Sequence, residues 1–428
     1  MPGTALFSRS TCRDSTVQTQ PNTIEKPARA SQASPSPTRA RRSPARGVEI
    51  LCGVRYKATE DMADDKRMMP YRHPSLVVRQ DEPFNAEPPL NLLRQAFVTP
   101  QSLFFVRNHG PVPEIDAGRY RLKVTGAIRS PFELSLGEIQ RKFPKQTVMA
   151  TLQCAGIRRD ELMVLRRIVG EVPWSAGTIS NAVWGGAALR EILKAAKVED
   201  GARHVAVTGL DEVERHGEEF GFGGSISIEK AMSPEVLLAY EMDSGPLPPA
   251  HGFPLRLVVP GYIGARSVKW LSGITVQTEP SANYFQAHAY KLFPPEVSPE
   301  TADWARGITL EGVSINSAIC QPGEGDTLTT GPVQVRGYAI GAGGQPIKEV
   351  EVSVDGGRTW VKAELGRDDH SWAWRFWETT FTLTRGSHQL IVRATDSAGN
   401  TQPQEASRIW NFKGYMNNAR HKVNVQVS

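Results

Sequence analysis

The run Val350-Glu351-Val352-Ser353-Val354-Asp355-Gly356-Gly357 alternates apolar and polar residues and then ends in residues that favour a turn. Such alternation over a short run is typical of a half-buried β-strand. Runs of the same kind recur around Val335, Trp374 and Val392, and the last of them ends at the turn sequence Ser397-Ala398-Gly399-Asn400. Strands at this spacing predict an antiparallel β-sandwich in the last third of the chain.

Residues 75–300 mix two kinds of periodicity. The run Tyr120-Arg121-Leu122-Lys123-Val124 alternates as a half-buried strand does, whereas the run from Gly186 to Ala196 places its large apolar residues on one helical face. Prolines between residues 294 and 304 mark a boundary. These patterns predict an α+β protein, with a mixed α/β domain over residues 75–300 followed by the β-sandwich over residues 301–428.

The chain has 428 residues, which is more than one core usually serves, so two domains with extensions are expected. Its net charge is +5, but residues 1–46 hold eight Lys and Arg residues against Asp14 and Glu25, a local balance of +6. The remainder is about neutral, so a nucleic-acid-binding face is not predicted. No run approaches the roughly 18 consecutive apolar residues of a membrane span, so no membrane partner is predicted.

Residues 1–60 form a basic arm, rich in Ser, Thr, Pro, Ala and Arg, whose composition predicts disorder. An Arg- and Ser-rich leader with few acids also fits an organelle transit peptide. The expected location is therefore mitochondrial if the arm is a targeting segment and cytoplasmic otherwise. No histidine precedes His73, so a bis-histidine haem site is not expected in the arm.

The chain's cysteines are far apart and form no CxxC pair, which argues against a disulfide framework or a structural zinc site. They are Cys12, Cys52, Cys154 and Cys320. Cys154 has the most suggestive setting, because Arg158 and Arg159 follow it in Thr151-Leu152-Gln153-Cys154-Ala155-Gly156-Ile157-Arg158-Arg159. Two guanidiniums are expected to lower the pKa of the thiol, and a soft thiolate suits a redox metal.

Two further clusters combine small residues with Arg, His or Lys donors. They are Phe104 to Pro113, which contains Arg107-Asn108-His109, and His251 to Trp270, which contains Arg256 and Ser267-Val268-Lys269. Such loops suit a phosphate-bearing ligand. The spacing excludes common alternatives, since no GxGxxG follows a strand and no GxxxxGK[ST] or HExxH occurs.

At these clusters the chain resembles the sulfite oxidase family, which also includes the molybdenum portion of eukaryotic nitrate reductases. The resemblance extends over most of the chain through ordered motifs. Besides the clusters above, these motifs are His73-Pro74-Ser75-Leu76, Pro83 to Pro89, Leu238-Ala239-Tyr240-Glu241-Met242, Tyr290-Lys291, and Trp410 to Asn418.

The resemblance implies a molybdenum–molybdopterin cofactor with Cys154 as the metal ligand. It implies an oxyanion pocket lined by Arg107, Arg159, Trp174, Tyr290 and Lys413. The matching cofactor-binding positions are Phe105, Val106, Arg107, Asn108, His109, Asp211, His251, Arg256, Ser267, Val268 and Lys269. It also implies that residues 301–428 form an immunoglobulin-like dimerisation domain, that the protein is a homodimer, and that Lys413 reaches the pocket from this second domain.

The implied reaction is oxidation of sulfite, or of a similar small oxyanion, to sulfate by oxygen-atom transfer. Arg107 and Arg159 would hold the dianion bidentately, and Tyr290 would donate a hydrogen bond to an oxygen. With no haem expected in this chain, electrons would pass to oxygen or to a separate carrier. The alternatives are a nitrate reductase-like molybdoenzyme, suggested by Met416-Asn417-Asn418, and a non-catalytic dimeric paralogue.

Three positions depart from the family pattern. Ile157 replaces the usual Asn after Cys-Ala-Gly, and Ala289 replaces an Asp before Tyr290. Lys413 stands where sulfite oxidases usually carry Arg and eukaryotic nitrate reductases an apolar residue. An ammonium is a hydrated point charge, whereas a guanidinium offers a planar fork, so this position is expected to hold an oxyanion less precisely.

Overall fold

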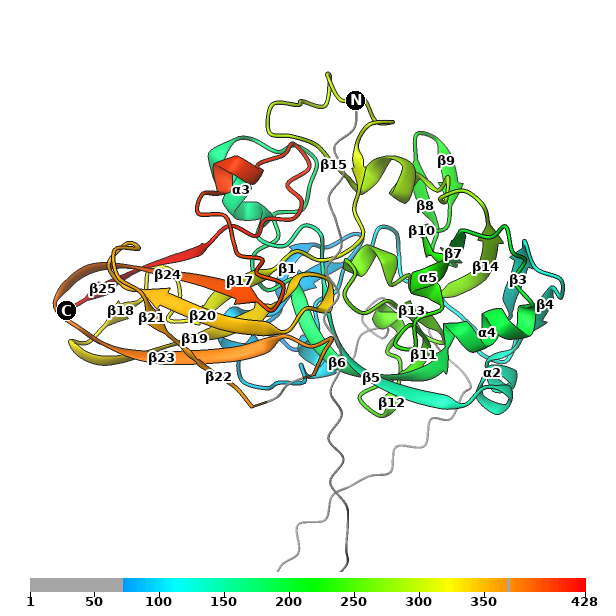
Figure 1. Cartoon of the computed structure of the whole chain (residues 1–428), viewed down its shortest axis with the longest axis horizontal. Helices are drawn as coiled ribbons and strands as arrows, with labels where there is room; N and C mark the ends of the chain where they lie inside the picture. The colour runs from blue at the N-terminus through cyan, green and yellow to red at the C-terminus, as the bar shows by residue number, and fades with distance from the viewer. Residues whose placement is uncertain (1–71, 368–369) are drawn as a thin grey trace, which may run out of the picture. The chain divides into compact units, whose positions relative to one another are not determined.

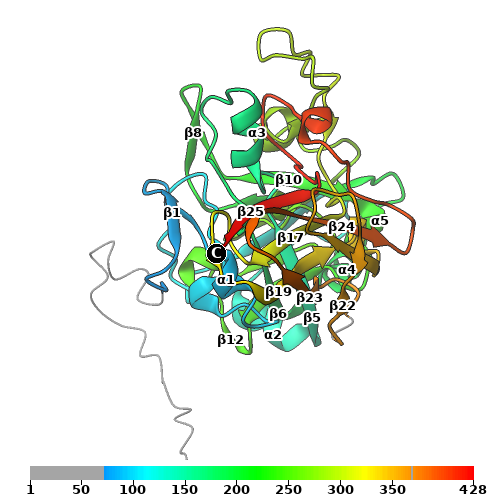
Figure 2. The ribbon, with the colours of Figure 1, turned by 90° about the vertical axis from the view of Figure 1, so that its left-hand side faces the viewer.

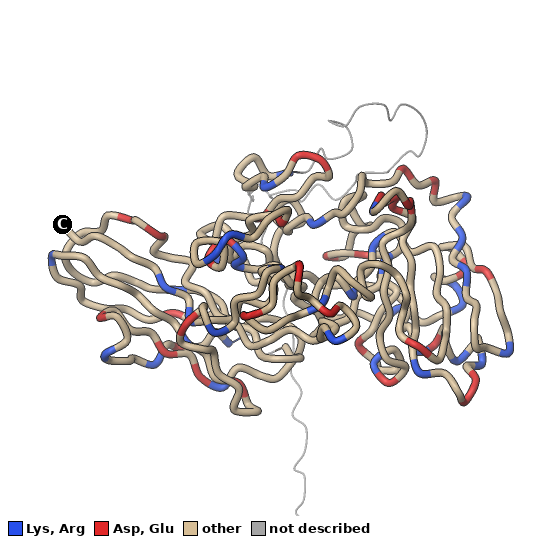
Figure 3. The backbone as a smooth tube through the Cα atoms, turned by 90° about the horizontal axis from the view of Figure 1, so that it is seen from above, with Lys and Arg blue, Asp and Glu red and all other residues tan. Residues whose placement is uncertain are grey.

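The computed structural model describes residues 72–367 and 370–428 (Figure 1). The predictions for the N-terminal arm, and the positions Cys12 and Cys52, lie outside these residues. No helix within the described ranges is long and apolar enough to cross a membrane. Basic and acidic residues are interspersed along the described backbone (Figure 3).

The first part of the described chain is built on two five-stranded sheets. One has the strand order β10 (Gly223–Ser227), β7 (His204–Gly209), β14 (Leu271–Gln277), β3 (Leu122–Gly126) and β4 (Phe132–Leu134), with only β14 and β3 parallel. The other has the order β12 (Gly245–Pro246), β11 (Leu237–Met242), β6 (Ile179–Ala188) and β5 (Lys145–Gln153), with β13 (Arg256–Val258) beside β11.

Short helices accompany these sheets. They are α1 (Leu90–Leu93), α2 (Leu136–Lys142), α3 (Arg159–Leu165), α4 (Leu189–Ala196) and α5 (Ile228–Ala231). In α2, Ser135 and Glu138 form a reciprocal capping box that satisfies free backbone N–H groups. The mixture of helices and strands confirms the predicted α+β class.

The C-terminal part is a sandwich of two sheets, which confirms the prediction from the alternating runs. One sheet has the order β17 (Asn316–Gln321), β19 (Gly331–Ile340), β23 (Arg375–Leu383) and β22 (Glu364–Leu365). The other has the order β18 (Thr327–Leu328), β25 (His421–Val427), β24 (Gly386–Asp396), β20 (Ile347–Ser353) and β21 (Val361–Lys362). Figure 2 views this sandwich from the end that bears the C-terminus.

Two local predictions were wrong in extent. The predicted helix from Gly186 begins only at Leu189, because Gly186 still belongs to β6, where a Cβ would lie 2.1 Å from the carbonyl oxygen of Leu238. In the predicted strand through Trp372, Trp374 and Phe376, Phe376 lies in β23 but the segment before Arg375 does not. Its backbone instead bonds to Thr151, with the Trp372 carbonyl accepting from the Thr151 N–H at 2.9 Å. The sandwich thereby braces β5 just before Cys154.

Candidate active site

Cys154 follows the last residue of β5 and lies in a tight loop that leads into α3. Its backbone N–H donates to the Thr178 carbonyl at 3.0 Å, and the Gly156 N–H donates to its Sγ at 3.3 Å. Burial raises the pKa of the Cys154 thiol, although Arg107 and Arg159 oppose that effect. The prediction that Arg158 and Arg159 lower this pKa was therefore wrong in net direction. Because burial outweighs the guanidiniums, the thiolate needs a further positive charge, such as a metal ion.

A cavity opens at Cys154. Most of the predicted site residues meet on its wall, although they come from β13 and from loops far apart in the sequence. These residues are Phe105, Arg107, Asn108, His109, Cys154, Asp211, His251, Arg256, Ser267, Val268, Lys269 and Tyr290. Among the predicted residues, Val106, Arg159, Trp174 and Lys413 do not line this cavity.

The Arg107 loop is fixed by backbone pairing with strand β2 (Asn85–Glu87). Val106 exchanges two backbone hydrogen bonds with Ala86, at 2.8 and 3.0 Å. The Asn85 side chain accepts from the Asn108 N–H at 2.8 Å and from Arg107 Nη1 at 3.3 Å. Val106, which makes this pairing, is buried and does not line the cavity, whereas Arg107 does.

The wall of the cavity carries three cations, Arg107, Arg256 and Lys269, but only one carboxylate, Asp211. Within the part of the chain that the structure describes, none of the three cations forms an ion pair. Burial lowers the pKa of Arg256 to about 9 and that of Lys269 well below its usual range. Buried charges are costly unless they are paired, so this wall suits an anionic ligand.

Neutral backbone groups hold these cations in place. Arg256 donates to the carbonyls of His251 at 2.8 Å and Ser267 at 2.9 Å, and Lys269 donates to the Ala250 carbonyl at 2.8 Å and to the Asn108 side chain. The backbone reaches this arrangement by turning at Gly252, whose φ of 107° favours glycine. The cations are thus positioned without being neutralised.

His109 and Tyr290, which also line the cavity, form one hydrogen-bonded pair, with 2.9 Å between Nε2 and the phenolic oxygen. Burial lowers the pKa of His109 well below its usual value and raises that of Tyr290, so both groups are neutral near pH 7. The His109 ring stacks on Phe222 with 4.5 Å between ring centroids. Phe222 lines the cavity but lies in no cluster that the sequence singled out.

Trp174 is fully buried in the same apolar cluster as Cys154, Phe104 and Phe105. Its indole nitrogen has no hydrogen-bond partner in the described structure. A buried donor without a partner carries a free-energy cost that an acceptor oxygen in the site would remove. This unpaired donor beside Cys154 is consistent with the predicted place of Trp174 in an oxyanion pocket.

Arg159 and Lys413 lie together next to the Cys154 loop. Arg159 Nε donates to the Lys413 carbonyl at 3.0 Å, and the carboxylate of Glu171 bridges Arg159, at 3.3 Å, and the Lys413 ammonium. Lys413 thus comes from the C-terminal part to contact Arg159, but neither residue lines the cavity, so the place of Lys413 in the pocket stays a prediction. Glu171 was missed, because no motif or spacing around it distinguishes it from a solvated loop residue.

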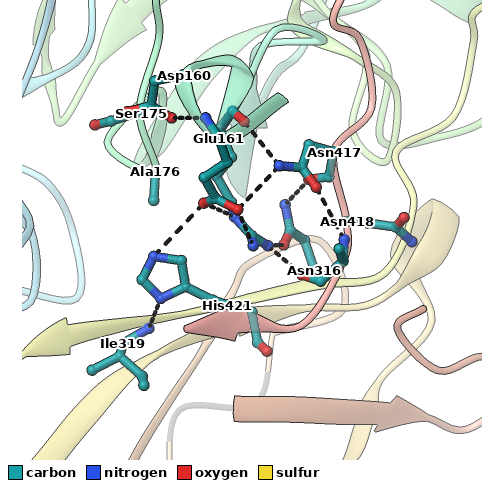
Figure 4. A network of polar contacts seen from close by, with 12 residues as sticks. Asp160, Glu161, Ser175, Ala176, Asn316, Ile319, Asn417, Asn418 and His421 are labelled. Atoms are coloured by element: carbon teal, nitrogen blue, oxygen red, sulfur yellow. Dashed lines mark hydrogen bonds and ion pairs between the residues drawn. The ribbon is translucent and has the colours of Figure 1, made fainter. Parts of the chain in front are cut away.

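Arg158 does not line the cavity, and it instead joins a polar network between α3 and the sandwich, in which Glu161, Asn316 and Asn417 are labelled in Figure 4. It forms a two-pronged ion pair with Glu161, at 2.7 and 2.8 Å, and donates to Asn316 at 3.0 Å and to the Ala419 carbonyl at 2.6 Å. The Asn417 side chain donates to the Arg158 carbonyl at 2.9 Å. The Met416-Asn417-Asn418 motif thus anchors the cysteine loop to the sandwich.

The two other departures from the family pattern have simple surroundings. Ile157 is fully buried in the main apolar core, so it fills space that a polar side chain would have to share with apolar neighbours. Ala289 closes the π-helical turn Phe285–Ala289 directly before Tyr290 and packs against the same core.

Comparison with known proteins agrees with this site. The family model for the oxidoreductase molybdopterin binding domain matches residues 109–285, and that for the Mo-co oxidoreductase dimerisation domain matches residues 308–428. Mitochondrial sulfite oxidase of Rattus norvegicus is 44% identical over 84% of this chain and 67% of its own length. Sulfite oxidase of Arabidopsis thaliana is 42% identical over 84% of this chain and 95% of its own length.

Among solved structures, the sulfane dehydrogenase of Paracoccus pantotrophus matches with a TM-score of 0.70 over 86% of this chain and 96% of that one. At 23% identity this match concerns the fold alone. Fold and site together define a molybdopterin-binding oxidoreductase. More narrowly, the chain belongs to the sulfite oxidase family.

Proposed function

We propose that this protein oxidises sulfite to sulfate at a molybdenum–molybdopterin centre whose protein ligand to the metal is Cys154. The observation that carries the proposal is the cavity at Cys154, whose described wall carries the cations Arg107, Arg256 and Lys269 and a single carboxylate. Relatives named sulfite oxidases, at 42–44% identity over most of the chain, support the choice of substrate.

The residues on the wall fit a cofactor that bears an anionic group. Arg256 and Lys269 would neutralise that group, and the Ser267 and Asn108 loops would hold the pterin, because they combine donors with closely approaching backbone. When bound, the cofactor supplies a thiolate-ligated metal that accepts two electrons and exchanges an oxygen atom. Val106, buried behind Arg107, would set the position of this loop through its pairing with Ala86.

Arg107, Arg159, Trp174, Tyr290 and Lys413 would bind and orient the oxyanion. Arg107 is the cation of this set that lines the cavity directly. Because Tyr290 stays protonated, it can donate a hydrogen bond to a substrate oxygen, and the indole of Trp174 can donate another. The cations of this set, Arg107, Arg159 and Lys413, together favour a dianion such as sulfite over the singly charged nitrate. The nitrate reductase alternative therefore ranks second.

We further propose that residues 75–300 form the catalytic domain and that residues 301–428 form the homodimer, since that segment matches a dimerisation domain. The electron acceptor would be oxygen or a separate carrier, with no haem held by this chain. The polar network around Arg158 would keep the sandwich and the cysteine loop in one arrangement.

The first experiment measures molybdenum content and sulfite-dependent reduction of an artificial acceptor by the purified protein. Cys154→Ser should abolish turnover while leaving a folded dimer, because an alcohol is a much poorer ligand for a soft metal site than a thiolate. Cys320→Ser is the matched control, since Cys320 is also a buried free cysteine but lies in β17 away from the cavity. Near-normal turnover in Cys154→Ser would contradict the assignment of the ligand.

Two other results would favour the alternatives. Faster turnover of nitrate, with electrons from a reduced dye, would support a nitrate reductase. A dimer purified without molybdenum from a host that supplies the cofactor would support the non-catalytic paralogue.

A further inference from the structure

A carboxylate of the chain itself lies between two of the cations assigned to the oxyanion pocket. Glu171 Oε2 is 3.3 Å from Arg159 Nη2, and Glu171 Oε1 pairs with the ammonium of Lys413. The two oxygens of one carboxylate thus bridge two cations in the manner of a bound oxyanion. The side chain of Glu171 is 14% exposed, so this contact is only partly screened by water.

The remaining donors of Arg159 are already engaged by backbone. Its Nε bonds to the carbonyls of Lys413 and Gly414, at 3.0 and 3.2 Å, and its Nη1 bonds to the Val172 carbonyl at 2.9 Å. In the described structure the contacts to Glu171 are therefore the ones that an incoming anion could replace on Arg159 and Lys413 without disturbing the backbone.

The charge of Glu171 also reaches the reaction site. Burial is the main reason that the pKa of Tyr290 is raised; Cys154 and Glu171 add to that effect, and Arg107 and Arg159 oppose it. Burial also raises the pKa of Tyr415, and the same carboxylate adds to that effect; the Tyr415 ring stacks on Tyr290 with 5.3 Å between centroids. Glu171 is therefore part of the electrostatic environment of Tyr290, the proposed substrate-binding tyrosine.

We propose that Glu171 sets the affinity of the site for oxyanions by acting as an internal counter-anion, competing with the oxyanion for Arg159 and Lys413. The proposal rests on the proposed sulfite-oxidising function and deepens it. Arg107, Arg159 and Lys413 contribute three positive charges, and Glu171 reduces the balance to two, which matches one dianion. Substrate and product are both dianions of similar shape, so Glu171 weakens sulfite binding and also prevents sulfate from being retained.

A purely structural role is the rival explanation, since Glu171 also ties the loop before Trp174 to the loop at Lys413. The two roles predict different patterns. A structural brace is damaged whichever partner is removed, so each single variant and the double variant would bind anions poorly. A counter-anion gives single variants of opposite sign, and removing both charges restores the original balance.

The test measures the KM for sulfite and, independently of turnover, the Kd for sulfate by isothermal titration calorimetry of the holoenzyme. Glu171→Gln keeps the shape of the side chain and should lower both constants by about tenfold, as expected for removing one competing charge-assisted contact. Lys413→Gln should raise both by about tenfold, since it leaves Glu171 facing the substrate. Glu171→Gln combined with Lys413→Gln should return both constants close to the wild-type values.

Glu241→Gln is the matched control, because Glu241 forms a partly exposed ion pair with Lys145 away from the cavity. It should leave both constants unchanged. A sulfite KM and sulfate Kd that are unchanged or higher in Glu171→Gln would overturn the proposal, as would a double variant as impaired as Lys413→Gln. Failure of the proposed function is distinguishable, since wild-type protein would then show no sulfite oxidation although the sulfate affinities could still follow the expected pattern.

Discussion

Two groups of cations, one at the cavity and one at the sandwich, are arranged in opposite ways. On the cavity side, Arg256 and Lys269 are held by neutral carbonyl and amide oxygens, and burial lowers the pKa of each. On the sandwich side, Arg158 has a carboxylate partner in Glu161. Burial alone would raise the pKa of Glu161, but Arg158 and nearby donors leave that pKa below its usual value.

This contrast distinguishes cations that are suited to bind a ligand from cations that stabilise the fold. A buried cation whose partners are all neutral lowers the stability of the empty protein and gains energy when an anion arrives. A buried cation with a matched carboxylate gains nothing from an added anion but loses much when one partner is removed. The cations of the cavity therefore mark a ligand-binding site, whereas the network around Arg158 is a structural contact between the cysteine loop and the sandwich.

The largest expected effect is the loss of stability on removing Arg158. Arg158→Met should lower the free energy of unfolding by about 3 to 4 kcal/mol, because it leaves Glu161 and the buried acceptors of Asn316 and Ala419 without their donor. The lower part of the usual range applies since the Glu161 side chain is 34% exposed and keeps some hydration.

Urea unfolding of the cofactor-free protein measures this effect. Arg107→Met is the matched comparison, because Arg107 lies in the cavity wall and leaves no carboxylate unpaired; it should cost about 1 kcal/mol or less. Equal losses of unfolding free energy in the two variants would show that the cavity cation and the network cation do not differ in their structural role.

A second prediction concerns His421, whose Nδ1 accepts from the Ile319 N–H at 3.1 Å at the edge of the same network. Burial lowers the pKa of His421 to about 4 in the folded state, against about 6.5 when unfolded. The folded protein thus binds fewer protons, so its stability is fully present above pH 6.5 and falls as the pH drops toward 4. The loss should approach about 3 kcal/mol.

Comparing wild type with His421→Gln by urea unfolding at pH 7 and pH 4.5 isolates this contribution, because the other titrating groups are common to both. Stability of the variant should fall less on acidification. The same dependence on pH in both proteins would show that His421 does not titrate with the network.

The sequence predicted most of the residues that line the cavity but little of the structural network around Arg158. The motifs around Arg107, Cys154 and Lys269 pair small residues with cations, a local pattern that a ligand requires, and the described structure brings them to one cavity. The alternating runs predicted the sandwich because period-2 patterns depend only on which face of a strand is buried. Both patterns are local in the sequence, so they could be recognised without the structure.

What failed was the direction in which neighbouring side chains point. Arg158 and Arg159 are adjacent, yet Arg158 has the left-handed φ of 57° before α3 and turns to the sandwich, while Arg159 packs beside Gly156. Spacing cannot reveal such a divergence, since it depends on the partner surfaces. Glu171 and Phe222 were missed for the same reason, because only tertiary contacts with Lys413 and His109 give them a place in the site.

The third prediction tests the cavity side directly, with the cofactor-free protein and inorganic pyrophosphate as the probe. An anion that binds only the folded state stabilises it by about 2.7 kcal/mol at a hundred times its Kd. We expect pyrophosphate to raise the thermal unfolding temperature, and Lys269→Met to reduce that rise, since Lys269 is a cation of the cavity wall that pairs with no carboxylate among the described residues.

The control for this prediction is Lys145→Met, which removes a lysine paired with Glu241 on the partly exposed edge of β5. It should leave the response to pyrophosphate intact. Arg158→Met, although much less stable, should show the same rise in unfolding temperature above its own value without pyrophosphate. The guanidinium that it lacks belongs to the polar network and not to the cavity wall. If Arg158→Met lost the response and Lys269→Met kept it, the anion would be binding at the network, and the unpaired cations of the cavity would not mark the site.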